Sequence, residues 1–288
     1  MSHIEIFERN RPRLTGVAYG MLGSVMEAED VVQEAYLRWQ GVDLVDIDSP
    51  EAYLTTITTR LAMDRLKSAQ VRRETYVGPW LPEPLVSAFA EDPAEVVAEA
   101  ESLSMTLLMA LEGLSPIERA VLLLREVFDL DYAEIADIVD KSPANSRQIA
   151  KRARENAATR KRPASRDLEV ESRIISRYLE AISKGDVEGV ASVFAEDVVL
   201  WSDGGGKTRA ARHALYGARR VARHLVGVRP QTPEGTEIRI ARVNGQPAIL
   251  GVLDGRVIGS ISFEIDEEQV IAVHAVLNPD KLHHLSDL

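Results

Sequence analysis

The chain has 288 residues, with 34 Lys and Arg, 45 Asp and Glu, and no cysteine. At roughly 150 residues per domain, this length predicts two domains or three small ones. The lack of cysteine excludes disulfides, thiolate zinc sites and cysteine nucleophiles. The six histidines form no compact set of metal ligands, so we expect neither a metal nor another cofactor. The charged N-terminus and the lack of a long apolar run predict a cytoplasmic protein without a membrane span.

The acidic excess is unevenly distributed along the chain. Between Arg147 and Arg166, eight basic residues stand against a single acidic one, Glu155. A basic stretch in an acidic protein predicts a local contact with a polyanion, and the alternative is an ordinary solvated helix face.

Residues 1–73 are predicted to form helices. Ser49 followed by Pro50 indicates a helix start, because the hydroxyl can cap the helix and proline lacks only an N–H that would be unpaired there. Apolar residues recur at helical spacing at Ala28, Val31, Val32, Ala35 and Trp39, and again at Leu54, Ile57 and Leu61.

Residues 74–93 are predicted to be an extended linker. Four prolines fall within this short segment, at positions 79, 82, 84 and 93, and closely spaced prolines prevent a continuous helix. The segment separates two helical regions, so it marks a domain boundary.

Helices resume over residues 94–163. Ser115-Pro116-Ile117-Glu118 forms a capping box, and Asp131 with Glu134 gives a similar start for a short helix over 132–139. Ser142-Pro143 then opens a third helix, running to about Ala158. Two helices joined by a tight connection predict a helix-turn-helix whose second helix is the basic one.

The remainder, residues 168–288, changes character. Helices are predicted from Val170 to Ile182, with Gly185 placed to end the first, from Val187 to Phe194, and after His213. Strands are predicted over 236–243, 247–253, 256–265 and 269–277. Helices followed by a strand meander predict an α+β domain with helices on one face of a curved antiparallel sheet.

Four motifs in the first 163 residues resemble the sigma-70 family, in its extracytoplasmic-function group. They are AEDVVQEAY from Ala28, TTRLAMDRLK from Thr58, LSPIER from Leu114 and YAEIA from Tyr132. The resemblance implies two all-α sigma domains, region 2 (1–73) and region 4 (94–163), joined by the linker. It also implies an alternative sigma factor, not an enzyme, that binds core RNA polymerase and directs promoter-specific initiation.

Residues 168–288 resemble a SnoaL-like cone, which a subgroup of these sigma factors carries at the C-terminus. Three motifs support this: Trp80-Leu81-Pro82-Glu83-Pro84 in the linker, Asp203-Gly204-Gly205-Gly206-Lys207, and Asn278-Pro279-Asp280-Lys281-Leu282. The resemblance implies that these segments are interdomain contacts through which the cone modulates the sigma domains in cis. The alternatives are a flexible turn for the glycine motif and a strand terminator for the last motif.

A polymerase-binding face is implied for the first conserved helix. Asp30, Glu34 and Arg38 follow at four-residue intervals, so they share a face opposite the apolar stripe, flanked by Gln33. The resemblance implies that the partners are the β′ clamp helices and, for region 4, the β flap. A solvated face is the alternative.

Two helices are implied to read promoter DNA. Near the start of the predicted recognition helix, Asn145, Arg147 and Gln148 can reach base edges of the minus-35 element, and Lys151 and Arg152 suit phosphates. The resemblance implies that the segment from Thr58 reads the minus-10 element, through Arg60, Asp64, Arg65, Lys67, Arg72 and Arg73. Arg60 stands where many relatives carry Asn, and an Arg60–Asp64 pair within the helix is the alternative reading.

Two other function classes remain open from the sequence. The cone could be an enzyme or bind a small-molecule ligand, with Asp203, His274 and Tyr178 as candidate acid–base groups, although a core histidine is the simpler reading of His274. A repressor that uses only the helix-turn-helix is the second class, and the polymerase-like helix from Ala28 argues against it.

Overall fold

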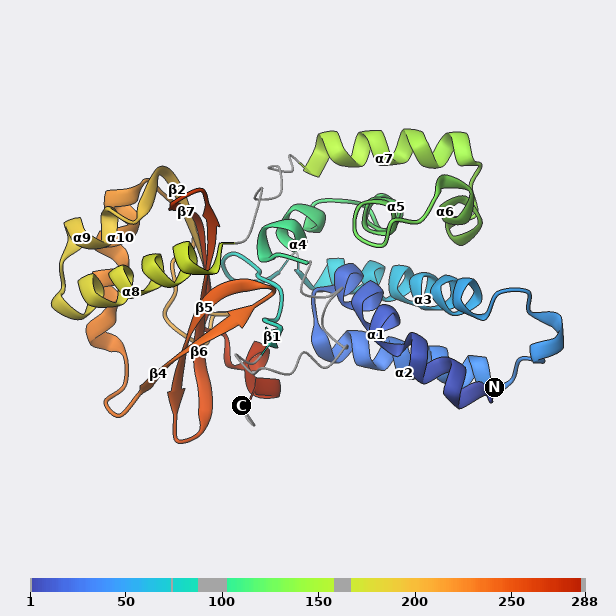
Figure 1. Cartoon of the computed structure of the whole chain (residues 1–288), viewed down its shortest axis with the longest axis horizontal. Helices are drawn as coiled ribbons and strands as arrows, with labels where there is room; N and C mark the ends of the chain where they lie inside the picture. Colours follow the sequence, from blue (N-terminus) through green and yellow to red (C-terminus); the bar gives the residue numbers. More distant parts are fainter. Residues whose placement is uncertain (1, 74, 88–102, 158–166, 286–288) are drawn as a thin grey trace. The chain divides into compact units, whose positions relative to one another are not determined.

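The computed structural model describes residues 2–73, 75–87, 103–157 and 167–285. The chain divides into two compact units (Figure 1). The first comprises Met1–Thr75 and Ala90–Thr159, and the second comprises Tyr76–Phe89 and Arg160–Leu288. Residues 76–87 of the linker therefore belong with the C-terminal domain rather than with the helices that the linker connects.

The N-terminal module of the first unit contains α1 (His3–Leu22), α2 (Val25–Gln40) and α3 (Pro50–Arg73), with the short helix η1 (Leu44–Asp46) before α3. A capping box of Ser2 and Glu5 starts α1, and Gly23 ends it in the left-handed conformation that glycine adopts freely. The predicted cap of α3 is present, because the backbone N–H of Ala52 donates to the Ser49 hydroxyl. The core includes Phe7, Leu14, Val17, Trp39, Leu54 and Leu66.

The helix-turn-helix module of the first unit contains α4 (Met105–Glu112), α5 (Pro116–Glu126), α6 (Tyr132–Val139) and α7 (Pro143–Ala157). The predicted capping boxes at the starts of α5 and α6 are both formed. Asp140 ends α6 with φ of 54°, which gives the tight turn into α7. Residues 94–102 and 158–163 of the predicted region lie outside the described residues.

Helices α5 and α6 pack between α7 and the N-terminal module (Figure 1). A Cβ atom at Gly20 of α1 would come within 2.7 Å of the Leu123 side chain on α5, so a larger residue here would have to displace that side chain. The fully buried guanidinium of Arg119 on α5 donates to the Gly20 carbonyl at 3.1 Å and pairs with Glu112 at 3.2 Å. The two modules are therefore in direct contact.

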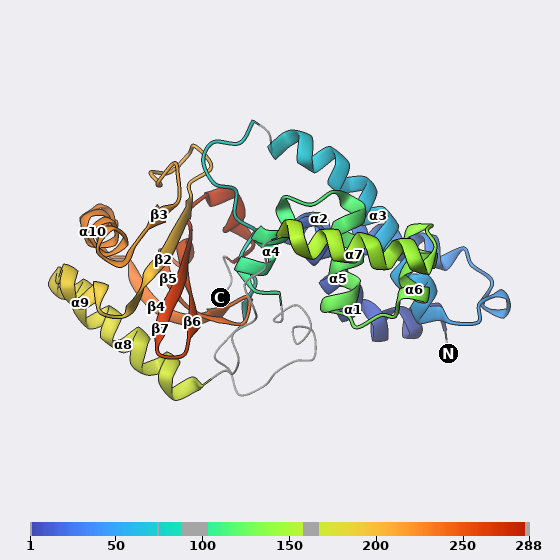
Figure 2. The same cartoon turned by 90° about the horizontal axis from the view of Figure 1, so that it is seen from above.

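The second unit is built on one seven-stranded sheet with the order β1-β4-β5-β6-β7-β2-β3. The strands are β1 (Val86–Ser87), β2 (Phe194–Asp203), β3 (Leu215–Tyr216), β4 (Glu237–Val243), β5 (Gln246–Leu253), β6 (Arg256–Asp266) and β7 (Gln269–Val276). Helices α8 (Leu168–Lys184), α9 (Val187–Ala191) and α10 (Ala218–Val228) cover one side of the sheet (Figure 2). Short helices η3 (Arg229–Gln231), η4 (Pro279–Lys281) and η5 (His283–Leu285) complete the unit.

The predicted strand meander is confirmed. Two of its turns are the two-residue hairpin loops Asn244-Gly245 and Asp254-Gly255, in which both residues have positive φ. This conformation matches the twist of the flanking strands, so it fixes where the strands end. Gly185 ends α8 in the left-handed conformation, as predicted.

Two sequence predictions for this unit are corrected. The sheet is mixed rather than antiparallel, because β2 pairs with β7 in parallel. The helix predicted from Val187 to Phe194 ends at Ala191, and Phe194 begins β2. Strand β2 lies between β7 and β3, and its stretch Val198-Val199-Leu200 is buried throughout, so it shows none of the alternation by which a half-buried strand is recognised.

The linker contains a strand that the sequence did not predict. Strand β1 pairs antiparallel with the end of β4, with Val86 opposite Val243. Among the described residues, no helix has the length and apolar character needed to cross a bilayer.

Candidate functional site

The predicted polymerase-binding side chains lie together on the exposed face of α2. Asp30, Gln33, Glu34 and Arg38 are all exposed. Arg38 pairs with Glu34 at 2.6 Å, and Asp30 pairs with Arg65 of α3 at 2.9 Å. These exposed pairs contribute little to stability, so the face is free to exchange them for a partner.

Two apolar side chains on this face were missed by the sequence analysis. Met26 is 49% exposed and Leu37 is 61% exposed. Asp30, Gln33 and Leu37 follow Met26 by four, seven and eleven residues. All four side chains therefore lie on one stripe of the helix. That spacing was the available signal, because an apolar residue on the charged side of an amphipathic helix has no core to pack against.

The predicted minus-10 reading side chains lie on α3, but most have protein partners. Lys67 pairs with Asp64 at 2.8 Å, which replaces the predicted Arg60–Asp64 alternative. Arg60 instead reaches the helix-turn-helix module, where it donates to the carbonyls of Ile138 at 2.9 Å and Asp137 at 2.8 Å. The side chains of Arg72 and Arg73 lie outside the described residues.

The recognition helix α7 presents an exposed basic face. Arg147, Gln148, Lys151 and Arg152 are exposed, and Asn145 is half-buried. The Arg147 guanidinium lies 5.3 Å from the centre of the Tyr132 ring, which holds it near the start of α7. Since α5 and α6 occupy the opposite side of α7, this face is open to a polyanion. The basic residues at 160, 161, 162 and 166 lie outside the described residues.

The three motifs of the linker and cone meet at Asp203, the last residue of β2. Its buried carboxylate accepts four hydrogen bonds, from the Tyr76 hydroxyl at 2.6 Å, the Leu81 N–H at 2.9 Å, the Gly205 N–H at 3.0 Å and the Lys281 ammonium at 2.7 Å. Asn278 donates to the Tyr76 hydroxyl at 2.8 Å. We call Tyr76, Trp80, Leu81, Asp203, Asn278 and Lys281 the linker clamp.

Lys281 closes the linker clamp from the other side. Its ammonium lies 4.0 Å from the centre of the Trp80 ring and 4.9 Å from that of Tyr76, and it also donates to the Leu81 carbonyl. The buried charge is therefore matched by a carboxylate, a carbonyl and two aromatic faces. Burial and the hydrogen bond to Asp203 raise the pKa of Tyr76 above its usual range, so its hydroxyl stays protonated and donates.

The glycine motif allows the close approach that the linker clamp needs. A Cβ atom at Gly205, where φ is 58°, would lie 2.3 Å from the Asn278 amide nitrogen. A Cβ atom at Gly204 would lie 2.2 Å from the Thr208 carbonyl oxygen. Lys207 pairs with Asp280 at 2.6 Å on the exposed side. The glycine motif therefore requires its glycines for packing, and the turn is not merely flexible.

The rest of the linker motif is also held by the second unit. Pro82, Glu83 and Pro84 are buried, as is Leu282 of the last motif, whose Pro279 begins η4. Further along, Leu85 and Asn244 exchange two hydrogen bonds, at 3.1 and 2.8 Å. The sequence analysis missed Tyr76 and Asn244, because Asn244 reads as a hairpin residue and Tyr76 precedes the recognised linker motif.

The candidate acid–base groups of the cone are not arranged for catalysis. Asp203 belongs to the linker clamp. Burial raises the pKa of the Tyr178 hydroxyl, whose ring packs against Phe263, and burial lowers the pKa of His274 to about 3. The His274 ring stacks on Trp201 with 5.3 Å between ring centres. These residues are structural in character, which agrees with the simpler reading of His274.

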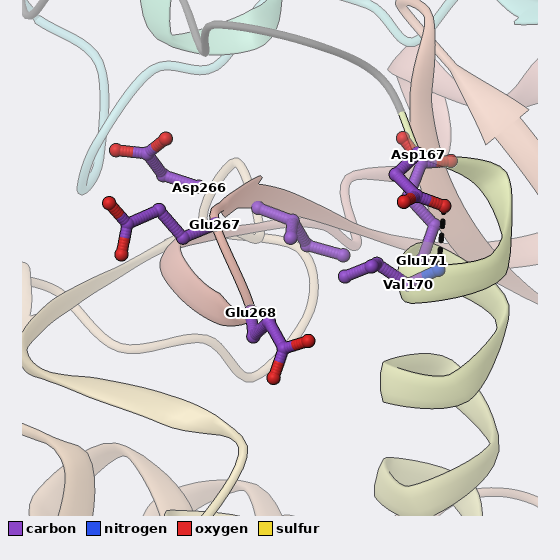
Figure 3. Close-up of a pocket in the computed structure, with 7 residues that line it drawn as sticks. Asp167, Val170, Glu171, Asp266, Glu267 and Glu268 are labelled. Atoms are coloured by element: carbon purple, nitrogen blue, oxygen red, sulfur yellow. Dashed lines mark hydrogen bonds between the residues drawn. The ribbon is translucent and has the colours of Figure 1, made fainter.

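An acidic pocket of about 220 Å³ lies between the start of α8 and the turn from β6 to β7 (Figure 3). Two of its carboxylates have arginine partners, Glu171 with Arg242 and Glu268 with Arg173, both at 2.8 Å. Within the described part of the chain, no group of three or more Asp, Glu or His residues is placed to hold a metal ion.

Comparison with known proteins gives consistent matches. Residues 6–72 match the family model of Sigma-70 region 2, and residues 104–156 match Sigma-70, region 4. The ECF RNA polymerase sigma factor SigJ of Mycobacterium tuberculosis is 36% identical over 286 residues, covering 96% of this chain and 91% of SigJ. A probable ECF sigma factor, SigI, from the same species is 31% identical over 280 residues, covering 96% and 93%. The crystal structure of SigJ aligns with a TM-score of 0.77 at 32% identity, covering 96% of this chain and 97% of that one.

Proposed function

The chain belongs to the extracytoplasmic-function group of sigma-70 factors, and we propose that it meets the polymerase through α2 and the promoter through α3 and α7, under control of its C-terminal domain. As a member of this family it is an alternative sigma factor, which binds core RNA polymerase and promoter DNA and directs transcription initiation. Sigma factors are not enzymes, since nucleotide polymerisation belongs to the polymerase.

The exposed stripe of α2 is the proposed contact with the β′ clamp helices. Met26 and Leu37 supply apolar area, and Asp30, Gln33 and Glu34 supply polar contacts around it. An exposed apolar strip rimmed by polar groups is typical of a protein interface. The acidic groups would favour a basic partner surface, and the helix-turn-helix module would dock on the β flap.

The exposed face of α7 is the proposed minus-35 contact. Arg147 and Gln148, near the helix start, are exposed and would meet base edges. Lys151 and Arg152 are exposed and would bind phosphates, with the Lys151 ammonium exchanging the exposed Glu155 carboxylate, 4.0 Å away, for one. Helix α3 is the proposed minus-10 contact. Its Arg60 is engaged by α6, so a contact of this side chain with DNA would require it to leave the α6 carbonyls.

We propose that the cone controls the sigma domains in cis by binding the linker. The supporting observation is that the Tyr76 hydroxyl and the Leu81 N–H both donate to Asp203. The linker connects the two DNA-reading modules. Residues 76–87 that are held on the cone cannot extend as the modules separate. We therefore assign the cone a regulatory role rather than a catalytic one.

Run-off transcription with core polymerase tests this control. The double variant Asp203→Asn, Lys281→Met removes both charges of the linker clamp, so that no buried charge is left unpaired. We expect several-fold more transcript, and faster proteolysis within residues 76–87, because the linker is released. The matched control is Arg219→Met, which breaks the exposed Arg219–Glu188 pair on the same domain. A linker that becomes cleavable without any change in transcript would refute control in cis and leave the sigma function intact.

A further inference from the structure

Arg60 joins the two DNA-reading modules at a point where both have a role. It lies in the segment of α3 proposed to read the minus-10 element, and its guanidinium donates to the carbonyls of Asp137 and Ile138 at the end of α6. We propose that Arg60 is a latch that holds the modules together in the free protein and is released when its guanidinium transfers to a DNA phosphate. This inference rests on the proposed function of α3.

The end of α6 provides the acceptors for this latch. The last carbonyls of a helix have no partner within the helix. Here the N–H groups of Asp140 and Lys141 both donate to the carbonyl of Ala136, which leaves the carbonyls of Asp137 and Ile138 to Arg60. The positive charge of the guanidinium also lies at the negative end of the α6 dipole. Arg60 thus caps a helix of the other module.

Arg60 is suited to exchange, whereas Arg119, another arginine between the modules, is not. Arg119 is fully buried, so its removal from the Gly20 carbonyl would require the helices to part first. Arg60 is exposed to solvent. Its two parallel donors fit a phosphate as well as they fit two carbonyls, and a charged acceptor binds a guanidinium more strongly than a neutral one. DNA can therefore compete for Arg60 while the modules are still together.

The promoter geometry requires the two modules to separate. The minus-10 and minus-35 elements lie about 25 base pairs apart, which is roughly 85 Å of duplex at about 3.4 Å per base pair. Arg60 and α6 are within hydrogen-bond distance of one another, so α3 and the helix-turn-helix module cannot read both elements in this arrangement. If the latch opens when α3 binds the minus-10 element, that binding also releases the helix-turn-helix module, which is proposed to bind the minus-35 element.

Single-molecule energy transfer between the modules tests the latch on the full chain. Because the chain has no cysteine, Glu29→Cys on α2 and Glu155→Cys on α7, both exposed, give two specific dye positions. In this background, without DNA or polymerase, we expect Arg60→Ala to raise the ratio of open to closed molecules about tenfold, as for loss of two exposed charge-assisted hydrogen bonds. Arg60→Lys keeps the charge but loses the two-pronged geometry, so it should fall between. The matched control Arg11→Ala, whose partner Glu8 is on the same helix, should behave as the parent.

Addition of a DNA duplex of 20 base pairs then distinguishes a contact that DNA releases from one that is only structural. We expect the duplex to open the parent, and to change the Arg60→Ala variant much less. An unchanged distance distribution in Arg60→Ala, or equal opening of both proteins by the duplex, would overturn the latch. Neither measurement uses polymerase, so either of these results would not bear on the sigma function. Conversely, a failure of transcription would not change the distances measured between the modules.

Discussion

At the scale of single residues, the second unit buries two basic side chains, Lys281 and His274, in different surroundings. Asp203, a carbonyl and two aromatic rings surround the Lys281 side chain. His274 lies beneath Trp201, and burial lowers its pKa to about 3, so it is neutral in the folded protein over the physiological range. His274 therefore links the stability of this unit to pH.

The His274 side chain predicts a pH dependence of stability. Its pKa is about 3 when folded and about 6.5 when unfolded, so between these values the unfolded chain binds more protons. Stability is then complete above about pH 6.5 and falls as the pH drops toward 3, by up to about 1.4 kcal/mol per pH unit from this group. Replacing His274 with Gln should flatten the curve of unfolding free energy between pH 6.5 and 4, whatever it does at pH 7.

Urea unfolding at a series of pH values gives this measurement. The matched control is His213→Gln, at an exposed histidine of the same unit, and the acid slope of His274→Gln is compared with the slope of this variant. Equal acid slopes in the parent and in His274→Gln would show that His274 is not the buried neutral group described here.

At the scale of elements, α7 divides its exposed side chains between two tasks. Arg147 lies near the helix start, against Tyr132, and Lys151 lies one turn further on. Residues near the start of a recognition helix meet base edges, and those further along meet phosphates. The two side chains should therefore fail in different ways when they are removed.

We predict that Arg147→Ala costs about 1–3 kcal/mol on the preferred promoter and relaxes the preference at one base position. Lys151→Ala should weaken binding equally across sequences and reduce the salt slope by about one. The measurement is promoter binding by the reconstituted holoenzyme at several salt concentrations. As a control, Arg154→Ala should leave sequence preference unchanged, because the Arg154 guanidinium is bound to Glu126. The same loss for Arg147→Ala on every sequence would contradict this assignment.

At the scale of the whole molecule, the elements were predictable from the sequence where the signal is local. The capping residues Ser115 and Asp131 define helix starts within a few residues, and alternation defines the strands from 256 onward. Strand β2 was missed because it is buried without alternation, and β1 was missed because its partner, β4, lies some 150 residues away in the chain.

The candidate site was predictable only in part, for the same physical reason. The resemblance identified the three motifs of the linker and cone, yet their meeting at Asp203 depends on contacts across more than 70 residues, as between Asp203 and Lys281. Arg60 was predicted to meet DNA, and its contact with α6 could not be predicted, because a backbone carbonyl at a helix end leaves no mark in the side-chain sequence.

The central claim is that this chain brings core polymerase to a promoter through the exposed face of α2. Run-off transcription on a promoter library, with core polymerase and the full chain, tests it most directly. We predict defined transcripts that require both components and that are lost with the double variant Asp30→Lys, Glu34→Lys, while the charge-matched control Glu180→Lys, Glu188→Lys on the C-terminal domain keeps them. No chain-dependent transcript from any promoter, or full transcription from the α2 variant, would contradict the account.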